Sequence, residues 1–78
     1  GPASILYEIA EAGPVEITVY SVDGRLVSRV YRGQSTRGLH RAEWNGTDSR
    51  GKSVASGVYY VRIENRGASA STKLLIVN

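Results

Sequence analysis

Hydrophobic and polar residues alternate with a period of two along most of this chain, and glycines interrupt the alternation at short intervals. In the first such run, Ile5, Tyr7 and Ile9 alternate with Leu6 and Glu8. Because successive side chains of a strand point to opposite faces, this pattern predicts a strand whose odd-numbered face points inward. No segment has an apolar period of 3.6 residues, so the sequence predicts no helix longer than a turn.

Further runs of the same kind predict the other strands. In residues 15–22, Val15, Ile17 and Val19 share one face. Asp23-Gly24 then predicts a hairpin turn, because glycine accepts a positive φ without a steric penalty. The remaining predicted segments are a returning strand at 25–32, a polar flexible stretch at 34–37, strands at 39–44, 58–64 and 72–77, and a last turn at 66–71.

The middle of the chain combines a candidate core residue with a turn-rich segment. Trp44 shares a face with His40 and Ala42 and is the best candidate for a core anchor. Residues 45–52 contain two glycines and two Asx side chains, which are the residue types that tight turns need. We therefore expect a structured loop between two strands.

Six or seven short alternating strands in 78 residues predict an all-β fold, an antiparallel sandwich in which each sheet buries one apolar face. A small barrel of the OB or SH3 type is the alternative. The expected unit is a single domain over residues 3–78, with Gly1 and Pro2 interpreted as the remnant of a cleaved purification tag. So small a domain has little room for a substrate cleft, which argues against an enzyme.

Composition narrows the classes of function further. The chain has no cysteine, so disulfides and Cys-ligated zinc are absent, and no apolar run is long enough to predict a transmembrane segment. The net charge of +3 comes from basic residues that are scattered among acidic and apolar ones. That distribution favours a solvated surface over a nucleic-acid site, and we expect a monomer without a nucleic-acid partner.

Three groups of residues could carry chemistry, and each has a simpler structural explanation. His40 and Asp48 with nearby serines suggest a hydrolytic triad, but a strand histidine and a turn aspartate explain them better. The oxygen-bearing side chains of Asn45, Thr47 and Asp48 suggest a calcium site. Only Asp48 is charged, however, and the nearby Arg50 and Lys52 would oppose a cation, so turn stabilisation explains the loop better. We therefore expect no catalytic residue, cofactor or metal. The tyrosines could form an exposed strip for sugars or bases, although filling half-buried sheet faces is their commoner use: Tyr7, Tyr20, Tyr31 and Tyr60.

Residues 38–60, GLHRAEWNGTDSRGKSVASGVYY, carry a dense motif. They resemble the pattern G-x-H-x-x-x-W-[DN]-G-x-D-x-x-G-x-x-V-x-S-G-V-Y of an immunoglobulin-like domain family. This family includes the Ig-like domain of the flagellar hook-capping protein and the type A C-terminal sorting domain of the type IX secretion system. Residues 15–26 (VEITVYSVDGRL) and 71–77 (STKLLIV) are similar to flanking strands of the same family. Asn45, where Asp is usual, and Ser21 are departures that turns tolerate.

The resemblance implies an immunoglobulin-like sandwich of about seven strands and a non-catalytic role. The expected function is a C-terminal module of a larger exported protein, acting as a type IX sorting signal and cell-surface attachment domain. Its partners would then be the upstream domain of the same polypeptide and outer-membrane secretion proteins, and its location the cell surface or the medium, reached through the periplasm and outer membrane. The alternatives are an assembly module of the hook-capping type and an accessory carbohydrate-binding module.

The motif residues are expected to build the fold, since tryptophan fills a core and glycines permit tight turns. These structural residues are Trp44, Gly46, Asp48, Gly51, Gly57 and Tyr59. The resemblance also implies that the secretion machinery reads the last strand, with Lys73, Leu75 and Val77 as the recognition residues.

Overall fold

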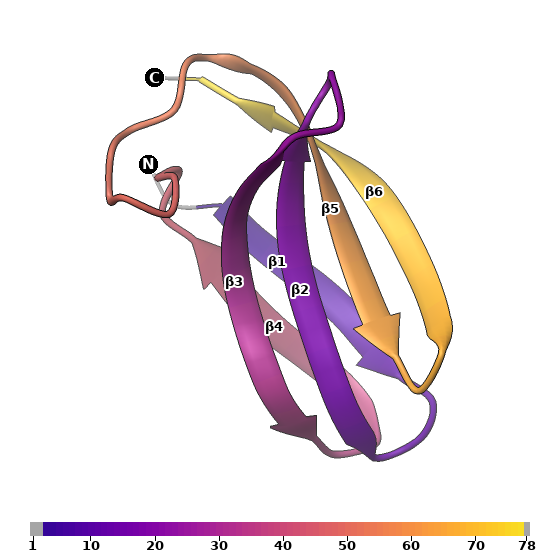
Figure 1. Cartoon of the computed structure of the whole chain (residues 1–78). Coiled ribbons are helices and arrows are strands. Elements are labelled where there is room, and N and C mark those ends of the chain that lie inside the picture. Colours follow the sequence, from indigo (N-terminus) through magenta and orange to yellow (C-terminus); the bar gives the residue numbers. More distant parts are fainter. Residues whose placement is uncertain (1–2, 78) are drawn as a thin grey trace.

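The computed structural model describes residues 3–77, so the expected tag remnant Gly1-Pro2 lies outside the described residues. Within this range the chain forms strands joined by turns and loops (Figure 1). The strands are β1 (Ala3–Ile9), β2 (Gly13–Ser21), β3 (Leu26–Ser35), β4 (Gly38–Trp44), β5 (Gly57–Asn65) and β6 (Ala68–Ile76).

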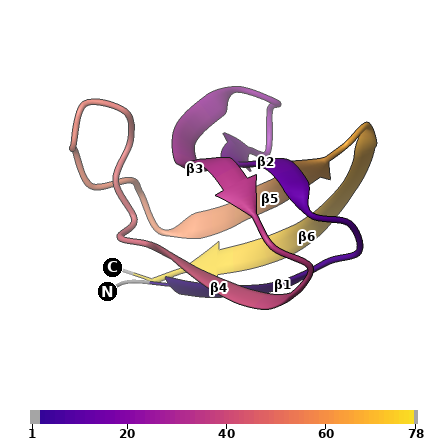
Figure 2. The same ribbon diagram turned by 90° about the horizontal axis from the view of Figure 1, so that it is seen from below.

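The strands make two antiparallel sheets of unequal size. β1 pairs with β4 in a two-stranded sheet, and β3-β2-β5-β6 is the order of the four-stranded sheet. Figure 2 shows the two sheets as separate layers, with β1 and β4 in one layer facing the other. The all-β sandwich prediction is confirmed and the barrel alternative is wrong, because neither sheet closes on itself: β1 and β4 are the edges of one sheet, and β3 and β6 are the edges of the other. The described residues contain six strands instead of about seven.

The core lies between the sheets and follows the predicted alternation. The buried residues from β1 are Ile5, Tyr7 and Ile9, and those from β2 are Val15, Ile17 and Val19. From β5, Tyr59 and Val61 point inward, and Ile76 closes the core from β6. Burial of these side chains is the main stabilising contribution in a domain without disulfides.

Trp44 is the core anchor that the sequence predicts, with 2% of its surface exposed. Its indole Nε1–H donates to the Thr47 carbonyl oxygen at 2.9 Å. Its ring meets the Tyr59 ring edge-on, with centroids 5.6 Å apart. Aromatic pairs prefer this geometry, and the hydrogen bond satisfies the indole's polar group, so the residue both fills the core and holds the following loop.

Two expectations about the segments between strands are wrong. The predicted flexible stretch at 34–37 partly belongs to β3, which continues to Ser35 opposite Gly13. The predicted turn at 66–71 is a two-residue turn, Arg66-Gly67, because β6 already pairs with β5 from Ala68 onward. Both central residues have positive φ, 52° and 85°, which matches the twist of antiparallel strands.

Long-range contacts hold Arg66 in this left-handed conformation. Its guanidinium Nε lies 3.1 Å from a carboxylate oxygen of Glu11. The neighbouring Asn65 side-chain amide donates to the carbonyl oxygen of Pro14 at 3.1 Å. These contacts join the turn to the β1–β2 connection. The prediction of a longer turn rested on the small, polar residues of the segment itself and could not include such distant partners.

No helix within residues 3–77 has the length and apolar character required to cross a membrane.

Candidate functional site

The loop after Trp44 is built around the carboxylate of Asp48. Its Oδ1 accepts backbone N–H groups from Lys52 at 3.0 Å and Arg50 at 2.9 Å. These hydrogen bonds, from Lys52 first and Arg50 second, lower the pKa of Asp48 because they favour the charged form. Gly46 and Gly51 have φ values of 74° and 80°, which permit the two tight turns of the loop.

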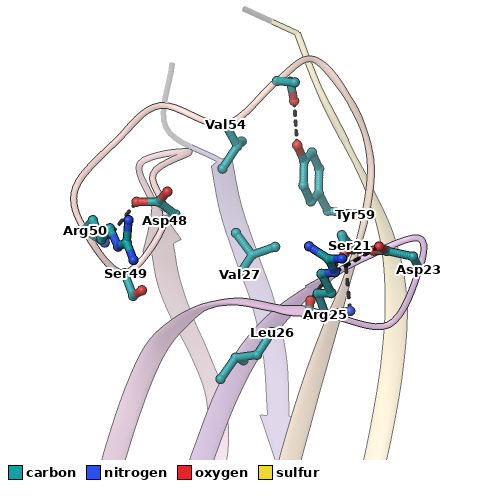
Figure 3. A pocket seen from close by; sticks show the side chains of 11 residues that line it. Ser21, Asp23, Arg25, Leu26, Val27, Asp48, Ser49, Arg50, Val54 and Tyr59 are labelled. Atoms are coloured by element: carbon teal, nitrogen blue, oxygen red, sulfur yellow. Dashed lines mark hydrogen bonds and ion pairs between the residues drawn. The ribbon is translucent and has the colours of Figure 1, made fainter.

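An open hollow of about 660 Å³ lies between this loop and the β2–β3 hairpin (Figure 3). Asp23 on the hairpin accepts a hydrogen bond from the Ser21 hydroxyl, which lowers the pKa of Asp23, and it forms an ion pair with Arg25 at 3.3 Å. The Tyr59 hydroxyl donates to the Ala55 carbonyl oxygen at 2.6 Å. Hydrogen bonds within their own turns therefore keep the Asp23 and Asp48 carboxylates ionised. A carboxylate whose pKa is lowered in this way accepts a proton poorly and is not suited to act as a general base.

The structure does not bring His40 and Asp48 together. His40 lies on β4, where its ring stacks on Tyr7 with centroids 5.5 Å apart, and its Nε2 is 2.7 Å from the Thr36 carbonyl oxygen. It lines a different hollow from the one beside Asp48. Within the described range 3–77, no cluster of three or more His, Cys, Asp or Glu residues could hold a metal ion.

Of the four tyrosines proposed for a strip, two lie on the core side of the sheets and two on the outer face of the four-stranded sheet. Tyr7 is buried in the core, and the Tyr31 hydroxyl donates to the Gln34 carbonyl oxygen at 2.7 Å. Tyr20 and Tyr60 are cross-strand neighbours on β2 and β5. They alternate with the buried Val19, Tyr59 and Val61, so they lie on the outer face of the four-stranded sheet.

Two of the predicted recognition residues lie on this same outer face. Lys73 is directly opposite Tyr60, and Leu75 is directly opposite Val58. Both are exposed on β6, and Val77, just after the strand, is exposed as well. One row of the register runs from Leu26 through Tyr20 and Tyr60 to Lys73, and the next row pairs Val58 with Leu75. Leu26 also lines the hollow beside the 45–52 loop. We call the apolar residues of these two rows the apolar half-face: Tyr20, Leu26, Val58, Tyr60 and Leu75.

The other half of the outer face is charged. Arg29 on β3 contacts Glu16 at 2.8 Å, and Arg62 contacts Glu64 at 3.5 Å along β5. Thr18 lies between Arg29 and Arg62 in the register and is buried, with 6% of its surface exposed. Long arginine side chains can bury such a neighbour under their aliphatic part. One sheet face is thus divided into an apolar end beside the β2–β3 hairpin and a charged end.

Sequence reasoning placed the tyrosines and the last strand in separate hypotheses and missed that they form one surface. The alternation does assign Tyr20, Tyr60 and Lys73 each to an outer face. Their alignment in one row depends on the pairing of β2 with β5 and of β5 with β6. Strand order is a long-range property, so no local signal could have joined them.

Comparison with known proteins identifies the family. Residues 3–69 match the family model described as the FlgD Ig-like domain. This chain belongs to that family.

A solved structure agrees with the assignment at the level of the fold. The chain superimposes on the crystal structure of FlgD from P. aeruginosa with a TM-score of 0.75 and 22% sequence identity. The match covers 97% of this chain and 60% of that FlgD chain. No curated protein matches this sequence. The resemblance to the hook-capping Ig-like domain is therefore confirmed, and this is a family of non-catalytic structural modules.

Proposed function

We propose that this FlgD Ig-like domain is a structural assembly module of a larger exported protein, which it holds to a neighbouring protein at the cell surface without bond chemistry. The observation that carries the proposal is the apolar half-face, where Leu75, Leu26 and Tyr60 remain 67%, 54% and 39% exposed on a folded domain. Contiguous exposed apolar surface beside a polar area is typical of protein interaction sites. The family match supports this hook-capping type of role.

The geometry favours binding over chemistry. The polar groups of the motif stabilise the fold: Trp44 and Tyr59 bond to loop carbonyls, and the Asp48 carboxylate bonds to its own turn. Such groups are satisfied internally and do not converge on a point where a substrate could react. The residues left for function are those on the outer faces.

A sorting signal for the type IX secretion system is the second candidate. It is favoured by the exposure of Lys73, Leu75 and Val77 on and just beyond an edge strand, where an export receptor could read them. A carbohydrate-binding role has less support, because Tyr7 and Tyr31 do not join Tyr20 and Tyr60 on one face.

Deletion of residues 3–78 from the parent protein in its native cell separates the first two candidates. Export is measured by fractionation, and assembly by native electrophoresis of the surface fraction. An assembly module predicts a parent that is exported but no longer incorporated. A sorting signal predicts a parent retained in the periplasm, and normal export with normal incorporation would contradict both.

Replacing Tyr60 by Ala in the isolated domain tests the carbohydrate hypothesis. A polysaccharide pull-down that depends on Tyr60 would support sugar binding in place of assembly. Retention that is equal for the Tyr60→Ala variant and the unmodified domain would exclude a tyrosine-based sugar site.

A further inference from the structure

We infer that the apolar half-face docks a partner protein whose contact surface is apolar and carries one Asp or Glu carboxylate that pairs with Lys73. This inference rests on the proposed assembly function and adds the surface and the chemistry of its partner. Lys73 is directly opposite Tyr60 in the strand register, so the cation lies at the β6 end of the apolar row.

Exposed apolar residues gather at one end of the four-stranded sheet. Seven large hydrophobic residues in the described range are exposed, and two of them, Leu6 and Leu39, lie on the outer face of the opposite sheet. The other five lie on the four-stranded sheet or directly follow one of its strands: Val22, Leu26, Tyr60, Leu75 and Val77. Figure 1 shows the β2–β3 hairpin and the end of β6 at the same end of the four-stranded sheet. Tyr60 and Leu75 lie on the neighbouring strands β5 and β6, and Leu26 lies on the opposite edge strand β3.

The charge pattern specifies what the partner must bring. On the outer face of the same sheet, Arg29 pairs with Glu16 and Arg62 with Glu64. Arg32 has no ion pair within residues 3–77, but it lies at the charged end, directly opposite Glu16 in the register. Lys73 forms no ion pair with any carboxylate of residues 3–77. Covering this ammonium with a purely apolar surface would bury an unpaired charge, which is costly, so a matching partner supplies a carboxylate.

A second copy of this chain does not fit the same requirement. Packing two apolar half-faces against each other across a twofold axis would bring two Lys73 ammoniums into one apolar interface. Each chain also carries a net charge of +3. Like charges in a desolvated interface disfavour association, so the charge pattern favours a different, acidic partner.

The borders of the patch define the docking area. The ion pairs of Glu16 and of Glu64 mark its charged side, where a polar rim is expected. Its lateral border is β6, the edge strand that carries Lys73 and Leu75 and pairs only with β5. A partner centred on Tyr60 and Lys73 would cover the apolar residues and leave the charged end in solvent.

Site-specific photo-crosslinking in the native cell tests this surface on the full parent protein. Leu75 is replaced by p-benzoylphenylalanine, and the matched control carries the same replacement at Leu39, which is 78% exposed on the opposite sheet. We expect a discrete cross-linked product from position 75 and none from position 39. The cross-linked partner is then identified by mass spectrometry, and its contact site by peptide mapping.

Charge reversal decides whether the product reflects the inferred pairing. In the position-75 background, Lys73→Glu should reduce cross-linking about tenfold or more, because it sets two carboxylates against each other, whereas Lys73→Arg should retain it. Changing the mapped partner carboxylate to Lys should restore cross-linking to the Lys73→Glu variant. Thermal unfolding of each variant domain checks that the fold is intact.

Equal cross-linking from both positions, a product between two copies of this chain, or insensitivity to Lys73→Glu would overturn the inference. These outcomes differ from failure of the assembly role. If deletion of the domain still prevents incorporation while position 75 gives no product, assembly uses another surface and only the present inference fails. If deletion has no effect on incorporation, the proposed function itself fails.

Discussion

Tyr59 and Tyr60 are adjacent in the chain but contribute to different properties of the molecule. Tyr59 packs edge-on against Trp44, and its hydroxyl donates to the Ala55 carbonyl oxygen. Tyr60 points to the outer face, between Tyr20 and Lys73. The period of two in a strand thus assigns one ring to the core and the next to the surface.

Removing the Tyr59 hydroxyl should therefore destabilise the domain. The Tyr59→Phe variant removes this part-buried hydrogen bond, and we expect the free energy of unfolding to fall by about 1 kcal/mol. Urea unfolding followed by tryptophan fluorescence measures the change. Tyr60→Phe is the matched control and should stay close to the parent stability; equal losses in both variants would contradict the assignment.

The Asp48 carboxylate should make stability depend on pH in the acid range. Its pKa is lowered in the folded state by the Lys52 and Arg50 N–H groups, so its stabilising contribution is present above the ordinary aspartate pKa of about 3.9. That contribution is lost as the pH falls through the lower folded pKa.

Urea unfolding of the Asp48→Asn variant across this pH range tests the effect. The variant should be less stable than the parent near neutral pH, and the difference should shrink as the solution is acidified. Asp23→Asn controls for the second aspartate whose pKa is lowered. A difference in unfolding free energy between the parent and Asp48→Asn that stays constant with pH would contradict the prediction, because the contribution of residue 48 would then not depend on the charge of its carboxylate.

At the scale of the elements, β5 connects the core to the proposed docking surface. Val61 has no exposed surface and packs between the sheets, whereas Val58, three residues earlier, faces outward opposite Leu75. The same residue type therefore has two roles on one strand.

Truncating these two valines should separate stability from docking. Val61→Ala removes buried methyl groups and leaves a cavity, which should lower the free energy of unfolding by about 2–3 kcal/mol. Val58→Ala should change it little, because the site is on the outer face. Calorimetric unfolding of both variants provides the comparison. A larger loss of stability for Val58→Ala than for Val61→Ala would contradict the assignment of Val61 to the core and Val58 to the outer face.

Substitution of Gly67 in the β5–β6 turn is limited by the backbone conformation and not by steric contact with neighbouring atoms. A Cβ at Gly67 would meet no atom within 4 Å, but the residue has a φ of 85°. Gly67→Ala should therefore cost about 1–2 kcal/mol through the left-handed conformation. Gly67→Asn should cost less, since asparagine tolerates this region; the order of the two urea midpoints is the test, and the reverse order would contradict it.

At the scale of the whole molecule, the fold is expected to need no metal. The loop 45–52 resembles a cation site in composition, but its Asp48 carboxylate already accepts two N–H groups, and Arg50 and Lys52 add positive charge nearby. Millimolar calcium should leave the Tm of the domain unchanged, as should a chelator. A rise in Tm with calcium but not with sodium at equal ionic strength would reveal a site.

The strands and their inward faces were predictable, because alternation is local. Ile5 and Ile17 were assigned to apolar strand faces from their spacing, Trp44 was assigned to the core because it is a tryptophan, and the structure buries all three. The Asp23-Gly24 hairpin was predictable for the same reason. The start of β6 was not, because Ala68 and Ser69 have little strand character of their own and are ordered by pairing with β5.

Local residue patterns were enough to predict the alternating faces and the main turn glycines, and the central motif gave the resemblance that the family match confirms for the FlgD Ig-like domain. Each of these follows from residues within one segment. The tertiary structure alone decided that β2, β5 and β6 are neighbours, and hence that Tyr20, Tyr60 and Lys73 share one row. The physical reason is that strand pairing is selected by burial of the whole core, a sum over segments far apart in the chain.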